Sequence, residues 1–126
     1  MGKILLCDDE ESLCRSLGRI LRAAGHEVVA MDGVRGYARL KEERFDLILT
    51  DIRMPDVNGF DVVEALRSRP DTARIPIVVV TAKQITPEDR AKLSGYVSTI
   101  VEKSGFDPDG FTAEIRRAMA GRAPAA

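Results

Sequence analysis

Five short apolar segments alternate with five segments of helical periodicity along the chain of 126 residues. The apolar segments are rich in leucine, isoleucine and valine, and uninterrupted runs of this length are typical of strands that are buried on both faces. Strands that alternate with helices indicate a parallel sheet covered by helices on both sides. The expected strands are Lys3–Cys7, His26–Met31, Asp46–Asp51, Ile77–Thr81 and Tyr96–Glu102. The expected helices are Glu11–Gly25, Val34–Arg44, Phe60–Arg69, Pro87–Ser94 and Asp107–Ala120.

The order of the strands follows from the handedness of their connections. Right-handed crossovers between parallel strands favour a doubly wound sheet. The expected fold class is therefore α/β, a flavodoxin-like five-stranded parallel sheet of order 2-1-3-4-5 with five helices. A chain of this length forms one domain. We place that domain at residues 1–121 and expect a frayed C-terminal tail at residues 122–126.

Composition limits the classes of partner. The net charge is −1, so bulk electrostatics do not indicate a nucleic-acid-binding face. No apolar stretch approaches the length of a membrane span, and the two residues before the first strand are too short for a secretory signal. The spacing of Cys7 and Cys14 fits neither a metal site nor a disulfide framework. We expect a cytoplasmic protein that contacts neither a membrane nor, directly, a nucleic acid.

Three aspartates follow expected strands that are neighbours in the sheet. Asp8 and Asp9 follow the first strand, and Asp51 ends the third strand. The carboxyl ends of parallel strands meet at one edge of the sheet, which is where ligands bind in open α/β folds. We therefore expect the three carboxylates to converge. Because like charges repel, such a cluster indicates a site for a hard divalent cation with oxygen ligands.

Four motifs stand at the carboxyl ends of these strands and in the loop after Asp51. They are Asp8-Asp9, Asp51-x-x-Met54-Pro55-x-x-Asn58-Gly59, Thr81-Ala82 and Lys103. Each motif is short, but together and in this order they resemble the receiver domains of bacterial response regulators over essentially the whole chain. Residues 81–90 also resemble receivers found at the C-terminus of hybrid sensor kinases.

The resemblance implies a phosphoacceptor in a two-component phosphorelay. Asp51 would take a phosphoryl group from a phospho-histidine of a histidine kinase or a histidine phosphotransfer protein, which suits a carboxylate nucleophile. Lys103 would pair with Asp51 before the transfer and with a phosphoryl oxygen after it. The Thr81 hydroxyl and the backbone N–H of Ala82 would each donate to another phosphoryl oxygen. Phosphorylation would switch contacts with a downstream protein target. The domain would be no enzyme, since it promotes only its own phosphorylation and dephosphorylation.

The same resemblance implies Mg²⁺ as the cofactor. Asp9 and Asp51 would bind the ion directly, Asp8 would bind it through water, and the backbone carbonyl of Arg53 would complete the protein ligands. Magnesium favours such a site because it keeps several waters and takes few carboxylates.

Two other functions and one structural role are weighed against this interpretation. A small aspartyl-phosphate phosphatase-like enzyme would want a second acid two residues after the nucleophile, where this chain has Arg53. A flavin or nucleotide module would want a glycine-rich phosphate loop after the first strand, where this chain has acids. Asp8 and Asp9 could also simply favour the start of the first helix.

Two positions depart from the receiver pattern. Ile100 stands where many receivers carry an aromatic residue that moves on activation, and the nearest aromatic residue in the strand is Tyr96. Ser104 stands where a cis proline commonly follows the lysine. These departures concern the output of the signal more than the phosphorylation.

Overall fold

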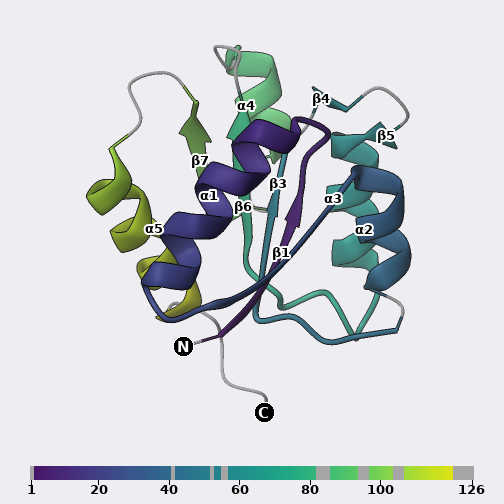
Figure 1. Ribbon diagram of the computed structural model, residues 1–126. Helices are drawn as coiled ribbons and strands as arrows, with labels where there is room; N and C mark the ends of the chain where they lie inside the picture. Colours follow the sequence, from purple (N-terminus) through teal and green to yellow (C-terminus); the bar gives the residue numbers. More distant parts are fainter. Residues whose placement is uncertain are drawn as a thin grey trace.

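The five principal strands form one parallel sheet of order β2-β1-β3-β6-β7. This is the 2-1-3-4-5 order that the sequence predicts, and Figure 1 shows it with helices on both sides. The strands are β1 (Lys3–Cys7), β2 (Glu27–Met31), β3 (Leu47–Thr50), β6 (Ile77–Thr81) and β7 (Thr99–Glu102). The computed structural model describes residues 2–40, 42–51, 53–54, 57–81, 86–93, 97–103 and 107–120.

Five helices lie in the described part of the chain. They are α1 (Glu11–Ala23), α2 (Gly33–Arg39), α3 (Gly59–Ser68), α4 (Pro87–Leu93) and α5 (Pro108–Ala120). Helix α1 ends at Ala23, and Gly25 follows its C-cap Ala24 with a φ of 99°, a left-handed conformation that glycine adopts without steric cost. None of the helices in the described ranges is long and apolar enough to cross a membrane.

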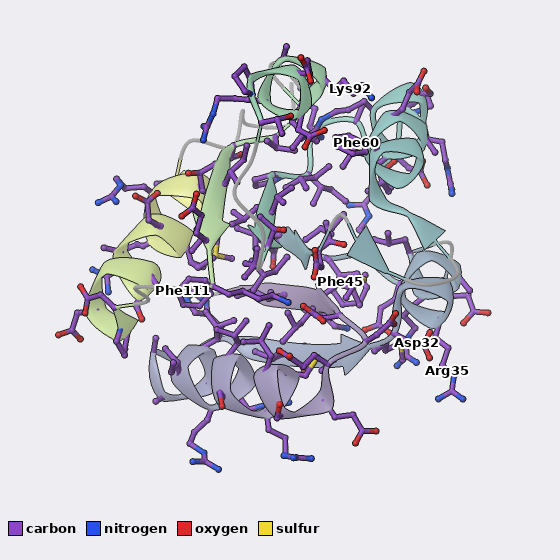
Figure 2. All side chains as sticks on the ribbon, turned by 90° about the horizontal axis from the view of Figure 1, so that it is seen from above. Asp32, Arg35, Phe45, Phe60, Lys92 and Phe111 are labelled. Carbon is purple, nitrogen blue, oxygen red and sulfur yellow. The ribbon has the colours of Figure 1, made fainter. Side chains whose placement is uncertain are left out.

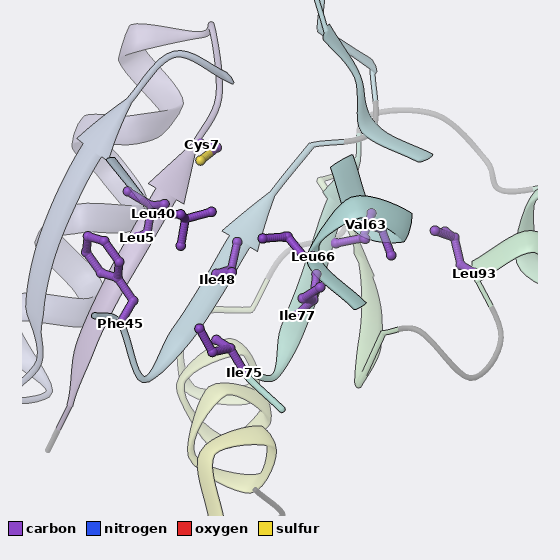
Figure 3. Close-up of a cluster of buried hydrophobic side chains, with 11 residues drawn as sticks. Leu5, Cys7, Leu40, Phe45, Ile48, Val63, Leu66, Ile75, Ile77 and Leu93 are labelled. Carbon is purple, nitrogen blue, oxygen red and sulfur yellow. The ribbon is translucent and has the colours of Figure 1, made fainter. Parts of the chain in front are cut away.

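The sheet is buried on both faces, as continuous apolar strands require. Alternate residues of β1 enter two separate cores: Ile4 and Leu6 pack with α1 and α5, whereas Leu5 and Cys7 pack with side chains from the α2, α3 and α4 side. Figure 3 shows the second core, in which Ile48 lies between Leu5 and the α3 residue Leu66. Burying each such aliphatic side chain contributes roughly 1.5–3 kcal/mol.

Helix α2 is shorter than the sequence predicts. It ends at Arg39, whose carbonyl accepts from the backbone N–H groups of both Glu42 and Glu43, and its C-cap residue Leu40 is buried in the core. Its Gly36 lies against β1, where a β-carbon would collide with the Cys7 sulfur. The glycine that lowers helix propensity thus permits close packing of helix on strand.

The remaining differences concern short segments. Strand β7 begins at Thr99, and the earlier part of the expected strand includes Tyr96, which lies outside the described residues. After Asp51 the chain forms a two-stranded antiparallel ladder, β4 (Arg53–Met54) with β5 (Val57–Asn58), that the sequence did not predict. Two-residue strands are too short to show a period-2 pattern. The C-terminal tail also lies outside the described residues.

Candidate functional site

The ends of three neighbouring strands bring Asp8 and Asp51 to one edge of the sheet. Cys7 is in register with Thr50 of β3 and with Met31 of β2. The backbone N–H of Asp51 donates to the Cys7 carbonyl at 3.2 Å, and that of Asp8 donates to the Met31 carbonyl at 3.0 Å. The sheet therefore continues one residue beyond β1 and β3, so both aspartates are held by backbone hydrogen bonds.

Lys103 reaches the same edge from β7. Its backbone N–H donates to the carbonyl of Thr81 at 2.8 Å, which fixes it beside the end of β6. Its ammonium nitrogen lies 3.0 Å from Asp8 Oδ2 and 3.0 Å from Asp51 Oδ2. The lysine side chain is 14% exposed, and the aspartate side chains are 5% and 9% exposed. One ammonium is thus shared by two buried carboxylates.

The charges in this group do not cancel. Burial of the ammonium acts to lower the pKa of Lys103, but its hydrogen bonds and charge interactions with Asp51 and Asp8 outweigh burial, so the pKa lies above its ordinary value. Lys103 is therefore charged at neutral pH, and two ionised aspartates beside it leave one negative charge in excess. A buried excess charge is costly, and a further cation relieves it.

The two oxygens of Asp8 have different partners. Oδ1 accepts a hydrogen bond from the backbone N–H of Glu10 at 2.9 Å, and Oδ2 faces Lys103. The first contact forms the turn into α1, whose N-cap residue Glu10 makes no side-chain cap of its own. Asp8 thus forms the turn that precedes α1 and also belongs to the charged group. Helix capping and membership of the site are therefore not alternatives for this residue.

Asp9 lies apart from this group. Its side chain is exposed and lines an open cleft of about 490 Å³ between the starts of α1 and α2 and the end of β2. Within the described ranges, no three acidic, histidine or cysteine side chains are arranged to hold a metal ion. The expected convergence of three carboxylates is thus seen for Asp8 and Asp51, with the Lys103 ammonium between them.

Comparison with known proteins decides the family. Residues 4–116 match the family described as response regulator receiver domain. The chain belongs to this family. Receiver domains act in two-component signalling, where they are paired with sensor histidine kinases and downstream targets. As a group they generally lack the catalytic role of an enzyme.

Individual relatives differ in length. The chain is 36% identical over 91 residues to the gliding motility regulatory protein of Myxococcus xanthus, a match that covers 71% of this chain and 12% of that protein. It is 33% identical over 125 residues to the response regulator ArlR of Staphylococcus saprophyticus, covering 98% of this chain and 54% of ArlR. The chain therefore matches only a part of these longer proteins.

Solved receivers share the fold. The chemotaxis protein CheY4 of Vibrio cholerae is 29% identical, with a TM-score of 0.85 and coverage of 94% of this chain and 98% of that one. The receiver domain of the sensor histidine kinase PA1611 of Pseudomonas aeruginosa is 23% identical, with a TM-score of 0.84 over 95% of this chain and 98% of that one. That receiver was described with a magnesium ion coordinated in its active-site cleft.

The other site residues of the receiver motif occupy strand ends or undescribed positions. Thr81 is 1% exposed at the end of β6, and its carbonyl accepts from the backbone N–H of Lys103. Arg53 lies in β4, two residues after Asp51. Ala82 and Ser104 lie outside the described residues. Ile100, where many receivers carry an aromatic residue, is half-buried and packs against the core on the α3 side of the sheet.

The cleft beside the aspartates includes residues that the sequence did not mark as site residues. Cys14 lines it, and its thiol donates to the Asp8 carbonyl at 3.4 Å. Burial first, and then the charge of Asp8, raise the pKa of Cys14 to about 11, so the thiol stays protonated at neutral pH. Asp32 and Arg35 form the α2 side of the cleft and lie near each other at the periphery in Figure 2.

Only one of these cleft residues, Asp32, could have been recognised from the sequence around it. Asp32 is an acceptor before a helix, and its Oδ1 accepts from the backbone N–H of Arg35 at 2.9 Å as an N-cap. The positions of Cys14 and Arg35 depend on how α1 and α2 pack beside β2, which no sequence pattern specifies.

Proposed function

We propose that this receiver domain accepts a phosphoryl group on Asp51 from a phospho-histidine of a partner protein, and that phosphorylation changes its contacts with a downstream target. The observation that carries the proposal is the pairing of Asp51 with Lys103 at 3.0 Å on the carboxyl edge of the sheet. A carboxylate is a competent nucleophile for phosphoryl transfer, and the reaction depends chiefly on positioning and on neutralising charge.

The chemistry gives each proposed site residue a task. An oxygen of Asp51 forms a bond to phosphorus while the bond from phosphorus to the donor imidazole nitrogen breaks. The donor imidazole, which carries a proton on its other ring nitrogen, keeps the electron pair of the broken bond and leaves as neutral imidazole. Lys103 then pairs with an oxygen of the acyl phosphate, and the hydroxyl of Thr81 and the N–H of Ala82 donate to the others.

Magnesium fits the donors at this edge. The Lys103 ammonium stands between Asp8 and Asp51 as a cation would, and both groups offer the oxygen ligands that magnesium takes in proteins. Asp9, Asp51 and the carbonyl of Arg53 would hold the ion, with Asp8 bound through water. When bound, it neutralises charge on the transferring group. Asp8 already uses both oxygens, whereas Asp9 is exposed, which supports direct binding by Asp9 and indirect binding by Asp8.

The proposal is tested with a small phosphodonor. The protein is incubated with Mg²⁺ and acetyl phosphate and analysed by intact mass and site mapping. We expect one base-labile phosphoryl group on Asp51 and none on Asp51→Asn. The matched control is Asp46→Asn, which changes an aspartate just before β3, where it accepts from the Lys3 backbone at 2.8 Å. Full modification of Asp51→Asn would refute the assignment.

The order of the metal ligands has a separate test. Asp9→Ala should weaken Mg²⁺ binding more than Asp8→Ala, because a direct ligand contributes more than one that acts through water. Calorimetric titration of both variants measures the difference. Equal losses, or a larger loss from Asp8→Ala, would contradict the proposed ligand set.

A further inference from the structure

A buried side chain holds the backbone of Asp51 where the chain leaves the sheet. Strand β3 ends at Thr50, and the hydroxyl of Thr50 donates to the backbone carbonyl of Asp51 at 3.1 Å. Thr50 is 2% exposed and Asp51 is 7% exposed. Water is therefore poorly placed to replace the hydroxyl, and withdrawing a donor from a buried carbonyl is costly. The contact is thus a fixed part of the structure around Asp51.

This contact and one other restrain the backbone on both sides of Asp51. The N–H of Asp51 donates to the Cys7 carbonyl at 3.2 Å, which holds the peptide before the α-carbon. The Thr50 hydroxyl holds the peptide after it. A residue has only two soft backbone dihedrals, so holding the peptide planes on both sides restrains both of them. The direction in which the Asp51 side chain leaves the backbone is thereby set.

The other buried aspartate of the site is held in the same way. Strand β1 ends at Cys7, and the N–H of Asp8 donates to the Met31 carbonyl at 3.0 Å. The carbonyl of Asp8 accepts from the thiol of Cys14 at 3.4 Å. At both strand ends, therefore, a side-chain donor holds the carbonyl of the aspartate. A thiol is a weak donor, so the hydroxyl of Thr50 should contribute more than the thiol does.

We propose that Thr50 is a positioning residue for phosphoryl transfer, and that it acts through the backbone carbonyl of Asp51. This inference rests on the proposed phosphorylation of Asp51. Attack on phosphorus requires the nucleophilic oxygen to be closely placed and aligned, and small misplacements lower the rate steeply. The task of Thr50 is not to touch the phosphoryl group but to hold the peptide from which the nucleophile projects.

Two pairs of side chains separate the hydroxyl of Thr50 from its shape. Thr50→Val keeps the branched shape of the wild-type residue and removes the hydroxyl. Thr50→Ser and Thr50→Ala both lack the methyl group, and of these two the serine variant keeps the hydroxyl. If the hydroxyl positions Asp51, it should decide the rate of phosphorylation in both pairs.

The experiment measures the rate at which acetyl phosphate and Mg²⁺ phosphorylate the full chain, by intact mass, and the free energy of unfolding in urea. We expect Thr50→Val to react at least about fivefold more slowly than the wild type, and Thr50→Ser to react at nearly the wild-type rate. The matched control is Thr72→Val, which also removes a hydroxyl from a residue that is 2% exposed. That hydroxyl donates to the Leu66 carbonyl at 2.6 Å, in the segment that leads into the amino end of β6. Thr72→Val should lose stability and keep the wild-type rate.

Three results would overturn the proposal. The first is a wild-type rate in Thr50→Val, and the second is equal rates in Thr50→Ser and Thr50→Ala. The third is equal slowing in Thr72→Val, because the rate would then follow stability and not the position of Asp51. If Thr50→Val does not fold, the serine and alanine variants make the same comparison. A wild-type protein that takes no phosphoryl group on Asp51 would instead refute the proposed function.

Discussion

Two groups with the same composition lie at opposite ends of the sheet. At the carboxyl end, Lys103 is shared by Asp8 and Asp51. At the amino end, Lys3 is shared by two glutamates: its ammonium pairs with Glu43 and lies 3.8 Å from Glu27. Each group holds one lysine and two acids, but the acids of the first are 5% and 9% exposed and those of the second 24% and 69%.

Burial, and not composition, separates the two groups. At the amino end, Arg39 adds a second cation to Glu43 at 2.7 Å, and the Lys3 ammonium lies over the Phe45 ring, 5.3 Å from the ring centre. Hydrated, balanced charges of this kind fasten the start of β1 to the segment before β3 at little cost. At the carboxyl end the charge is unbalanced and shielded from water, which keeps it available to a cation or a phosphoryl group.

Replacing the lysine should produce the largest difference in stability between the two ends. In metal-free protein, Lys103→Met should lower the free energy of unfolding by about 2 kcal/mol, because two buried carboxylates lose charge-assisted hydrogen bonds. Lys3→Met should lower it by less than about 1 kcal/mol, as expected for exposed ion pairs. Urea denaturation with EDTA present measures both. Equal losses would show that burial does not distinguish the two groups.

Removing an acid should raise the free energy of unfolding at the carboxyl end and lower it at the amino end. In Asp8→Asn the remaining Asp51–Lys103 pair is neutral, and the amide oxygen can still accept from Glu10. We expect metal-free Asp8→Asn to be more stable than the wild type by up to about 1 kcal/mol. Glu43→Gln loses two cationic partners and should be slightly less stable. Thermal unfolding in EDTA tests the pair, and a destabilised Asp8→Asn would contradict the excess of negative charge.

The sequence predicted the carboxyl-end group better than the amino-end one. Asp8, Asp51 and Lys103 each follow an apolar run, so the strand order alone brings them to one edge. Lys3 and Glu43 meet because α2 ends at Arg39, and the residues after it bring Glu43 to the start of β1. That stop depends on burying Leu40 and Phe45, a tertiary requirement that overrides helical periodicity.

Within the site, the receiver resemblance implied that Lys103 pairs with Asp51, but its second pairing, with Asp8, was beyond the sequence. Strand order indicates that three aspartates approach one another, but it does not say which of them a lysine reaches. Asp8 is buried and Asp9 exposed because adjacent residues at a strand end point in opposite directions. The sharing of one ammonium by Asp8 and Asp51 depends on side-chain geometry, which the order of the strands does not determine.

The smallest expected effect is the acid response of the amino-end group. Hydrogen bonds from Lys3 and then Arg39 hold the pKa of Glu43 below its usual 4.5. A lowered pKa means that the folded protein binds fewer protons than the unfolded chain, so this contribution is present above pH 4.5 and is lost as pH falls through the folded pKa. We therefore expect the stability gap between wild type and Glu43→Gln to be constant near about pH 6 and to close toward about pH 3. Urea denaturation across this range measures the gap. High salt at neutral pH should narrow it as well, because exposed pairs are screened. A gap that persisted in acid would mean that Glu43 acts through packing and not through its charge.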